Sequence, residues 1–288
     1  MNKALMVGYL ESWQAGITFR QAAQSGFDAI VMAFGVIEGL SIGVFGGGFA
    51  PAPGAAAMKQ DIRDAKAAGA RQILFSVGGA HNTYRPGDAA AGDLARAVVE
   101  YLTEYGFTGI DFDLEIRADA GYLDCLCAAI RDLDASLLIT AAPQINQDDH
   151  AGNLYLVSID RCRLYDQAIA NGRFDYLFVQ GYNNPWPRIG GLGQRHTGFI
   201  SAAFRNLKQA VPAETMITMG EPANAMTGGF SLFSAPDVDE NVYARIAEQY
   251  RSIRGDEQFG GAMVWSIGWD AKAGYPFVGT MNSAIFGA

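Results

Sequence analysis

The sequence predicts a single (β/α)8 barrel that spans residues 1–288. Three observations support this fold. Short apolar segments alternate with longer helix-like segments along the chain, there are eight of each, and no repeat, charge run or linker interrupts the series. Strand–helix alternation implies a parallel sheet, and eight units in roughly 250 residues suit a closed barrel. Half of the 288 residues are hydrophobic, which is enough for one large core.

The predicted strands are short segments dominated by apolar residues. They cover residues 4–9, 29–34, 72–77, 109–115, 137–142, 176–182, 216–220 and 261–267. The predicted helices follow in turn, at residues 18–25, 58–68, 89–105, 118–133, 164–171, 199–210, 241–254 and 277–286. A doubly wound open sheet is the alternative, but it requires a glycine-rich phosphate-binding turn after the first strand. The segment GYLESW (8–13) is not such a turn, so the barrel is favoured.

The loops that follow the strands carry the functional information, because barrel active sites form at the carboxyl ends of strands. SVGG (76–79), QGYNNPW (180–186) and GEPA (220–223) end the third, sixth and seventh strands. The loop after the second strand, GLSIGVFGGGFAPAPG (39–54), is long and rich in glycine. We expect this loop to form a wall of the site.

Composition excludes several functional classes. A net charge of −9 argues against binding nucleic acid or an anionic membrane, and no apolar run approaches the ~20 residues of a membrane span. The opening MNKALMVGY passes from one lysine directly into a strand and contains no signal peptide. The numbered chain is therefore cytoplasmic, or, as we expect, belongs to a secreted protein and lacks its leader. Three cysteines without a CxxC pair or Cys/His cluster predict no zinc site.

The segment GIDFDLEI (109–116) places three acids on one face of a strand. Asp111, Asp113 and Glu115 alternate with apolar residues. Three interpretations compete: a solvated surface strand, a metal site, and acid–base catalysis. A strand inside an alternating αβ series is buried on both faces, which argues against the first. A single strand offers a cation few converging ligands, and no His or Asn follows closely, which argues against the second.

Acid–base catalysis fits the row best. Same-face neighbours on a strand lie about 7 Å apart, so three ionised carboxylates inside a barrel repel one another and titrate as a coupled unit. The row is expected to hold one or two protons. Glu115 lies nearest the rim and is best placed to carry the proton of a general acid.

The chain resembles glycoside hydrolase family 18. FTGIDFDLE (107–115) is similar to the family signature D-x-x-D-x-D-x-E, with Thr108 in place of the first acid. SVGG and QGYN (180–183) resemble the family's S-x-G-G and Q-x-Y-N, and VGY (7–9) and MVWSIGWD (263–270) also fit. One departure is Glu221, where many members have leucine, which could alter a subsite.

The resemblance implies a retaining reaction in which the substrate's own acetamido group is the nucleophile. Glu115 would protonate the glycosidic oxygen. Asp113 would hold the acetamido N–H and stabilise the oxazolinium ion, and Asp111 would set the charge of Asp113. The Tyr182 hydroxyl would position the acetamido oxygen for attack.

The resemblance also implies a substrate-binding set. Gln180 and Asn183 would bind the reacting sugar, Tyr9 and Ser76 would support the acid row, and Trp265 would form the floor. Trp13 and Trp186 follow the first and sixth strands, where sugar stacking and simple loop packing are equally good interpretations.

The sequence therefore predicts an endo-acting chitinase with no cofactor or metal, working as a monomer on chitin or N-acetylglucosamine oligosaccharides. Residues 221–261 hold little beyond one helix, so the α+β domain that deep-cleft relatives insert there is missing and an open cleft is expected. The alternatives are an endo-β-N-acetylglucosaminidase acting on glycoprotein glycans and a non-catalytic carbohydrate-binding barrel.

Overall fold

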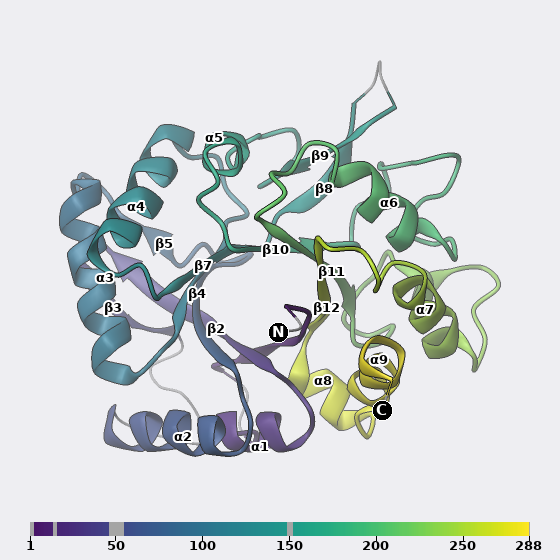
Figure 1. Cartoon of the computed structure of the whole chain (residues 1–288), viewed down its shortest axis with the longest axis horizontal. Helices are drawn as coiled ribbons and strands as arrows, with labels where there is room; N and C mark the ends of the chain where they lie inside the picture. The colour runs from purple at the N-terminus through teal and green to yellow at the C-terminus, as the bar shows by residue number, and fades with distance from the viewer. Residues whose placement is uncertain (1–2, 14–15, 46–54, 149–151, 288) are drawn as a thin grey trace.

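The computed structural model describes the chain except for residues 1–2, 14–15, 46–54, 149–151 and 288. Eight parallel strands form a closed ring with helices around it (Figure 1). In ring order these strands are β1 (Leu5–Glu11), β2 (Ala29–Glu38), β4 (Gln72–Gly78), β6 (Gly109–Asp113), β7 (Leu138–Ala141), β10 (Tyr176–Gln180), β11 (Met216–Pro222) and β12 (Phe259–Trp265). β12 pairs with β1, so the ring closes and the predicted barrel is confirmed.

Each predicted helix is present, with small shifts at its ends. They are α1 (Phe19–Gln24), α2 (Ala55–Ala67), α3 (Ala91–Tyr105), α4 (Ala120–Leu133), α5 (Asp166–Ala170), α6 (Phe199–Leu207), α7 (Val242–Arg251) and α9 (Pro276–Phe286). Local chemistry explains some of these boundaries. Thr18 caps α1, since its hydroxyl accepts from the Gln21 N–H while the Gln21 side chain accepts from the Thr18 N–H. α4 begins after Asp119, whose carboxylate accepts from the Gly121 N–H.

Several elements lie outside the predicted series. β3 (Ser41–Val44) and β5 (Tyr84–Arg85) pair with β2, while β8 (Gln144–Gln147) and β9 (Leu154–Val157) form an antiparallel hairpin beside β10. A short helix, α8 (Ile267–Lys272), and a 3-10 turn, η2 (Leu232–Ser234), are also present. These additional elements lie at the carboxyl ends of the barrel strands, where the site forms.

The prediction of a loop over residues 39–54 is partly wrong. Its first half is a strand, because β2 continues to Glu38 and turns back through Gly39, whose φ of +59° suits a tight hairpin, into β3. Residues 46–54, the rest of the predicted wall, lie outside the described part of the chain. The role of the whole loop as a wall therefore stays a prediction.

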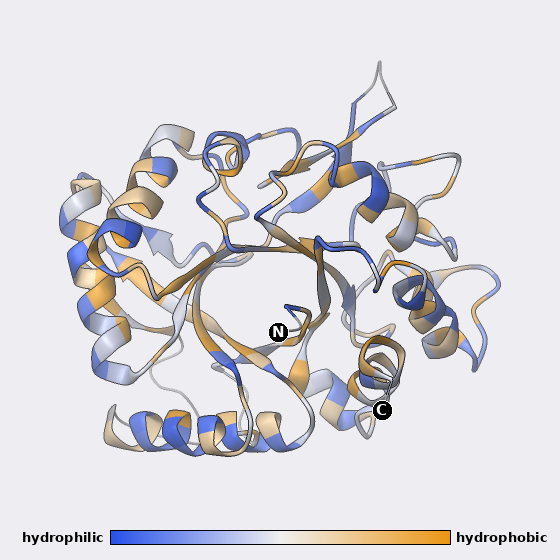
Figure 2. Cartoon of the chain, in the orientation of Figure 1, coloured by the Kyte–Doolittle hydropathy of each residue, from blue (hydrophilic) through white to orange (hydrophobic). Residues whose placement is uncertain are grey.

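The core has two layers separated by the barrel wall. Inward side chains such as Val7, Val31 and Phe178 fill the barrel, while their strand neighbours face the helices and form a larger cluster. Figure 2 shows the strands as mostly hydrophobic and the helices as mixed, as expected for strands buried on both faces. No helix among the described residues is long and apolar enough to cross a bilayer.

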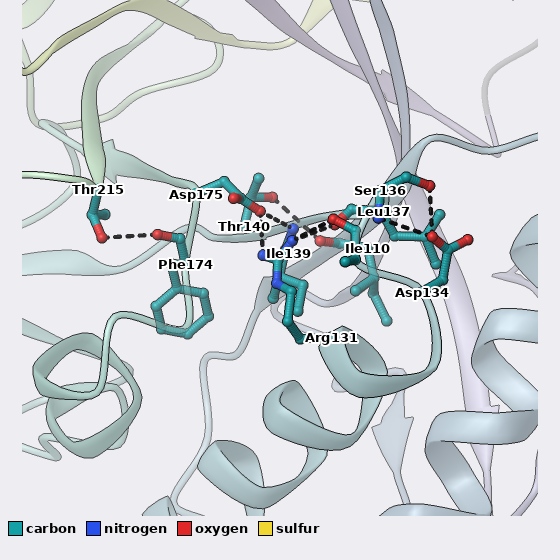
Figure 3. Close-up of polar contacts among 11 residues, drawn as sticks. Ile110, Arg131, Asp134, Ser136, Leu137, Ile139, Thr140, Phe174, Asp175 and Thr215 are labelled. Atoms are coloured by element: carbon teal, nitrogen blue, oxygen red, sulfur yellow. Dashed lines mark hydrogen bonds and ion pairs between the residues drawn. The ribbon is translucent and has the colours of Figure 1, made fainter.

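A polar cluster fixes the amino-terminal end of the barrel beneath the site (Figure 3). Arg131 at the end of α4 pairs with Asp175 at 2.6 Å, and the same carboxylate oxygen accepts from the Ile139 N–H at 2.8 Å. The Thr215 hydroxyl donates to the Phe174 carbonyl at 2.8 Å. These contacts join β7, β10 and β11 at their starting ends and thereby set the register with which the strands reach the site.

Candidate active site

Strand β6 turns two of the three acids into the barrel. Asp111 and Asp113 are 0% and 6% exposed, whereas Ile110 and Phe112 belong to the helix-side cluster. The predicted strand was too long at this point: β6 ends at Asp113, and half-buried Glu115 lies just beyond it, at the mouth of the barrel. The acids thus form a line that runs from the barrel interior to its rim.

Asp111 is held by three hydroxyl groups. Tyr9 Oη and Ser76 Oγ donate to its Oδ2 at 2.9 and 2.6 Å, and Thr140 Oγ1 donates to Oδ1 at 2.6 Å. Burial raises the pKa of Asp111, and the hydrogen bonds from Ser76, Thr140 and Tyr9 oppose that rise. Tyr9 and Ser76 both contact the first acid of the row, and their part in the site stays a prediction. Thr140 was missed, although strand register places it directly beside Asp111.

Asp113 and Glu115 share their environment. Gln180 Nε2 donates to Asp113 Oδ1 at 3.0 Å and to the Ala142 carbonyl at 3.0 Å. Burial raises the pKa of Asp113 well above its usual range, and the charges of Glu115 and Asp111 raise it further. Burial also raises the pKa of Glu115, whereas a hydrogen bond from Gln180 lowers it. The pKa values of both groups are therefore raised, and the pair titrates as a unit.

Tyr165 fixes the end of β6. Its hydroxyl oxygen accepts from the Leu114 N–H at 2.8 Å and lies 3.0 and 3.2 Å from the carbonyls of Phe112 and Leu114. The tyrosine is fully buried and comes from the segment just before α5. It takes the hydrogen bonds that a neighbouring strand would otherwise make, so the chain leaves the sheet between Asp113 and Glu115. Nothing in the sequence around Tyr165 signals this role.

The glycines of SVGG allow β4 to approach the acids closely. Gly78 has φ +120°, and a Cβ there would lie 2.0 Å from the Asp113 carbonyl oxygen. Gly79, with φ +64°, donates its N–H to the same oxygen at 2.7 Å. Any side chain at Gly78 would push β6 away, so this part of the motif has a direct steric cause.

A cavity of about 280 Å³ opens above the row. Asp113, Glu115, Gln180, Tyr182 and Asn183 line one part of it, and aromatic side chains line the other. Burial, followed by the charges of Asp113 and Glu115, raises the pKa of Tyr182, so its phenol stays protonated and available as a donor. The structure brings together the residues that the sequence predicted for the reacting sugar.

The aromatic part of this cavity is a packed set of rings. Phe34, Trp265 and Trp13 form a triangle of rings: the Phe34 centroid is 6.0 Å from that of Trp265 and 6.1 Å from that of Trp13, and the two tryptophan centroids are 6.3 Å apart. Tyr9 lies 5.8 Å from Trp265. Trp13 is 43% exposed and lines the cavity, so it both packs in the loop and faces the opening. His81, which the sequence left without a role, also lines the cavity and stacks on Phe45.

Glu11 anchors the turn that follows Trp265. Its carboxylate accepts from the Ser266 hydroxyl and from the Gly268 N–H, the latter at 3.2 Å, across more than 250 residues of sequence. Glu11 is 2% exposed. Burial raises its pKa, whereas these hydrogen bonds lower it. The contact ties the end of β1 to the start of α8 and so fixes the floor residue. Sequence reasoning missed it, since GYLESW gives no sign of its distant partner.

The structure does not place Glu221 with the predicted substrate-binding residues. On β11 the neighbours Ile217 and Met219 belong to the helix-side cluster, and alternation directs Glu221 the same way, toward Tyr250 of α7. It is 2% exposed, and its Oε2 has no hydrogen-bond partner among the described residues. Burial raises its pKa well above the usual range and so favours the neutral form of the side chain.

Replacing Glu221 by Leu is therefore expected to increase the free energy of unfolding at pH 7 by about 1–3 kcal/mol, because an unpaired buried carboxyl is removed. The raised pKa means that the folded state keeps a proton that the unfolded state loses above ~4.3. In the wild-type protein, the contribution of Glu221 to the free energy of unfolding is thus present below that pH and is lost as the pH rises. The difference in the free energy of unfolding between Glu221→Leu and the wild type should therefore increase with pH.

Urea unfolding at several pH values measures this difference. Glu214→Leu, at an exposed position, is the matched control and should change stability by less than about 0.5 kcal/mol. A destabilised Glu221→Leu variant, or a stability gain that does not depend on pH, would contradict the assignment.

No group of three or more His, Cys, Asp or Glu side chains in the described ranges is arranged to hold a metal ion. The acids follow one another along β6 and the residues just after it, instead of converging on a point. The donors present around it are hydroxyl and amide groups that bind carboxylates, and these suit proton sharing better than cation binding.

Comparisons with known proteins agree with this geometry. The sequence profile of glycosyl hydrolases family 18 matches residues 5–236. An acidic endochitinase of Phaseolus angularis is 26% identical over 220 residues, a match that takes in 71% of this chain and 63%, less than two thirds, of that protein. A family GH18 chitinase from Chromobacterium violaceum has a TM-score of 0.76 at 20% identity and covers 99% of this chain and 84% of its own.

A second similar structure was solved with a bound sugar. A plant class V chitinase mutant from Cycas revoluta, solved in complex with (GlcNAc)3, has a TM-score of 0.63 at 16% identity. The match covers 96% of this chain and 99% of that one. At these identities the structural comparisons bear on the fold, whereas the sequence profile covers most of the chain, including the acid row and the SVGG and QGYN segments.

Proposed function

The chain belongs to glycosyl hydrolase family 18, and from this premise we propose that it is an endo-acting chitinase that cleaves β-1,4-linked N-acetylglucosamine with retention. The observation that carries the proposal is the pair Asp113 and Glu115 at a cavity that Trp265 also lines. A general acid needs a raised pKa and access to substrate; burial raises the pKa of Glu115, and the residue lines the cavity.

In the first step Glu115 gives its proton to the glycosidic oxygen as the bond from that oxygen to the anomeric carbon breaks. The carbonyl oxygen of the 2-acetamido group forms the new bond to the anomeric carbon, and the product is an oxazolinium ion. Tyr182 donates its hydroxyl to the acetamido oxygen and thereby aligns it. In the second step water attacks the anomeric carbon from the side that the leaving group vacated, the bond from the acetamido oxygen to that carbon breaks, and Glu115 takes a proton from the water.

Asp113 accepts the acetamido N–H and stabilises the positive ring. Asp113 stabilises the positive ring best when its carboxylate is ionised, which requires that its proton move to Glu115. A proton shared by the two carboxyl groups allows that movement. Asp111 lies beneath the pair and is held by three hydroxyl donors, whose hydrogen bonds favour its ionised form against the rise in pKa that burial causes. Gln180 holds Asp113 in place through the 3.0 Å hydrogen bond, and Asn183 lines the same sugar's cavity.

Endo-type cleavage of chitin is supported by two features. Between β11 and β12 the described residues form only η2 and α7, which leaves the cleft without an added wall. The relative from Phaseolus angularis is named an endochitinase, and the Cycas revoluta structure holds (GlcNAc)3. Both features favour a polymer of N-acetylglucosamine over a single terminal residue as the substrate.

A substrate comparison tests the proposal. The hexasaccharide of β-1,4-linked N-acetylglucosamine should be cleaved at internal bonds, whereas cellohexaose, which has the same backbone without the acetamido nucleophile, should be cleaved at least about 10³-fold more slowly. Product analysis by chromatography measures both rates. Comparable hydrolysis of cellohexaose would contradict the mechanism. Release of only the terminal dimer would contradict endo action, and faster cleavage of a high-mannose glycopeptide would contradict the substrate assignment.

A further inference from the structure

The backbone on both sides of Glu115 is held from one segment, which joins β9 to α5. Tyr165 Oη accepts from the N–H of Leu114, the residue before the acid, at 2.8 Å. Ser158 Oγ donates to the carbonyl of Ile116, the residue after the acid, at 2.7 Å. The two contacts span 51 and 42 residues of sequence. Two distant hydroxyl groups therefore fasten the peptide that carries the proposed acid.

The acid lies at a point where the sheet no longer holds the chain. β6 ends at Asp113, whose carbonyl accepts a hydrogen bond from the Gly79 N–H of the neighbouring loop at 2.7 Å. Among the described strands none pairs with residues 114–116. A segment without ladder hydrogen bonds moves more freely than a strand does. The position of the Glu115 carboxyl is therefore set by the groups that hold the residues on either side of it.

Tyr165 is itself held firmly. The side chain is fully buried, and its ring meets the Phe174 ring edge-on with centroids 6.2 Å apart. Its carbonyl accepts from the Ile169 N–H at 2.9 Å, in the first turn of α5. Its hydroxyl also lies 3.0 Å from the Phe112 carbonyl, to which it donates. A phenol oxygen that is fixed by ring packing and by two hydrogen bonds gives the Leu114 N–H one position.

Ser158 is also buried, at the start of a short turn. Its N–H donates to the Cys162 carbonyl at 2.9 Å, and this bond closes the turn and directs the Ser158 hydroxyl toward Ile116. A third contact in this region, the ion pair of Arg117 with Asp160 at 3.2 Å, joins side chains that are 69% and 70% exposed. Exposed ion pairs contribute little, so the two hydroxyl groups are the contacts that matter.

Both hydroxyl groups lie behind the site and not in it. Leu114 belongs to the helix-side cluster, and neither Tyr165 nor Ser158 lines the cavity above the acids. A general acid must lie within hydrogen-bond reach of the oxygen that it protonates, and a misplacement of about 1 Å can cost ~10²-fold in rate. Loss of either hydroxyl would therefore act on the reaction through the position of Glu115, while the substrate contacts remain.

We propose that Tyr165 and Ser158 are positioning residues for the acid, which hold the backbone of Leu114 and Ile116 so that the Glu115 carboxyl meets the leaving oxygen. The inference rests on the proposed function, because it takes Glu115 as the acid. It assigns part of the rate of glycosidic cleavage to two side chains that never touch the substrate.

The test compares two substrates whose leaving groups need different amounts of acid assistance. The hexasaccharide loses a sugar hydroxyl, which needs a proton, whereas the 4-nitrophenyl β-glycoside of the N,N′-diacetyl disaccharide loses a stable phenolate. Tyr165→Phe is expected to lower kcat/KM for the hexasaccharide about 10- to 100-fold, with KM within about threefold of wild type. For the nitrophenyl glycoside kcat/KM should fall less than about threefold. Ser158→Ala should act in the same direction, by about 3- to 10-fold on the hexasaccharide.

Tyr250→Phe and Ser201→Ala are the matched controls. Tyr250 is also fully buried, and its hydroxyl donates to the Met219 carbonyl of β11 at 2.9 Å. The Ser201 hydroxyl donates to the Gly198 carbonyl at 3.1 Å. Each control removes a hydroxyl from a backbone carbonyl away from the acid. The ratio of kcat/KM for the hexasaccharide to kcat/KM for the nitrophenyl glycoside should therefore stay within about twofold of wild type in both.

The substrate ratio distinguishes positioning from a general loss of structure. For either variant, an equal loss on both substrates, or a ratio within about twofold of wild type, would overturn the positioning role of that residue and leave the proposed function standing. A wild-type protein that cleaves neither substrate would overturn the proposed function, and the inference with it. Thermal unfolding compares Tyr165→Phe with Tyr250→Phe. If Tyr165→Phe does not fold, Ser158→Ala decides the question.

Discussion

Asp113→Asn is expected to lower kcat for the hexasaccharide about 10²- to 10³-fold, with KM within a few-fold of wild type. The asparagine keeps the shape of the side chain and an oxygen that can accept from Gln180, so the cavity should persist. What it lacks is the negative charge that stabilises the oxazolinium ion. The loss should therefore appear in the transition state and not in ground-state binding.

The same variant should also change the pH profile. The charge of Glu115 raises the pKa of Asp113. Because the repulsion between two carboxylates acts on both groups, removing the charge at position 113 is expected to let Glu115 lose its proton at lower pH. The alkaline limb of kcat/KM is expected to move to lower pH. Asp132→Asn, at an exposed position on α4, is the control and should have wild-type kinetics. A kcat of Asp113→Asn within tenfold of wild type, or a rise in KM alone, would show that Asp113 takes part only in substrate binding and would contradict its role in the transition state.

Most of the barrel was predictable because alternation is a property of neighbouring residues. All eight strands were located from short apolar segments, and their helices from the segments between them. The boundaries failed where a distant group decides them. The strand predicted over 109–115 ends at Asp113 because Tyr165, some 50 residues later, takes the hydrogen bonds around Leu114. Similarly, the strand predicted over 261–267 ends at Trp265, because the chain turns there into α8 and Glu11 binds the turn.

The acids were predictable for a physical reason. A strand that is buried on both faces is not expected to carry three carboxylates unless they have a chemical role. The alternation of acidic and apolar residues was enough to predict that all three acids point to the same face. The hydroxyl groups that hold them were harder to find. Tyr9 and Ser76 came from short motifs, whereas Thr140 lies in an ordinary apolar segment and is identified only once the register pairs it with Asp111.

The β8–β9 hairpin could not be predicted from pattern. Its strands have four residues each, and the first, QINQ (144–147), carries amides at positions where a strand signal needs apolar or β-branched side chains. The sequence left Trp13 and Trp186 undecided between stacking and packing. The structure separates them, since Trp13 packs on Phe34 in the cavity above the acids, whereas Trp186 stands exposed in a neighbouring cavity that the hairpin also lines.

Glu115→Gln is expected to lower turnover of the hexasaccharide by about 10³-fold, the usual contribution of a general acid. Glutamine has nearly the same size as glutamate and can still meet the Gln180 amide, but it has no proton to give to the leaving oxygen. Substrate contacts with Trp265, Tyr182 and Asp113 are untouched, so binding should persist. Glu257→Gln, at an exposed position, is the matched control and should retain wild-type turnover.

The most direct test of the shared proton at the barrel rim measures turnover and binding in one preparation of Glu115→Gln. Initial rates come from product chromatography, and the Kd for the hexasaccharide comes from titration calorimetry. The prediction is a roughly thousandfold loss of turnover with a Kd within about threefold of wild type. Turnover within about tenfold of wild type would show that Glu115 is not the acid and would contradict the account.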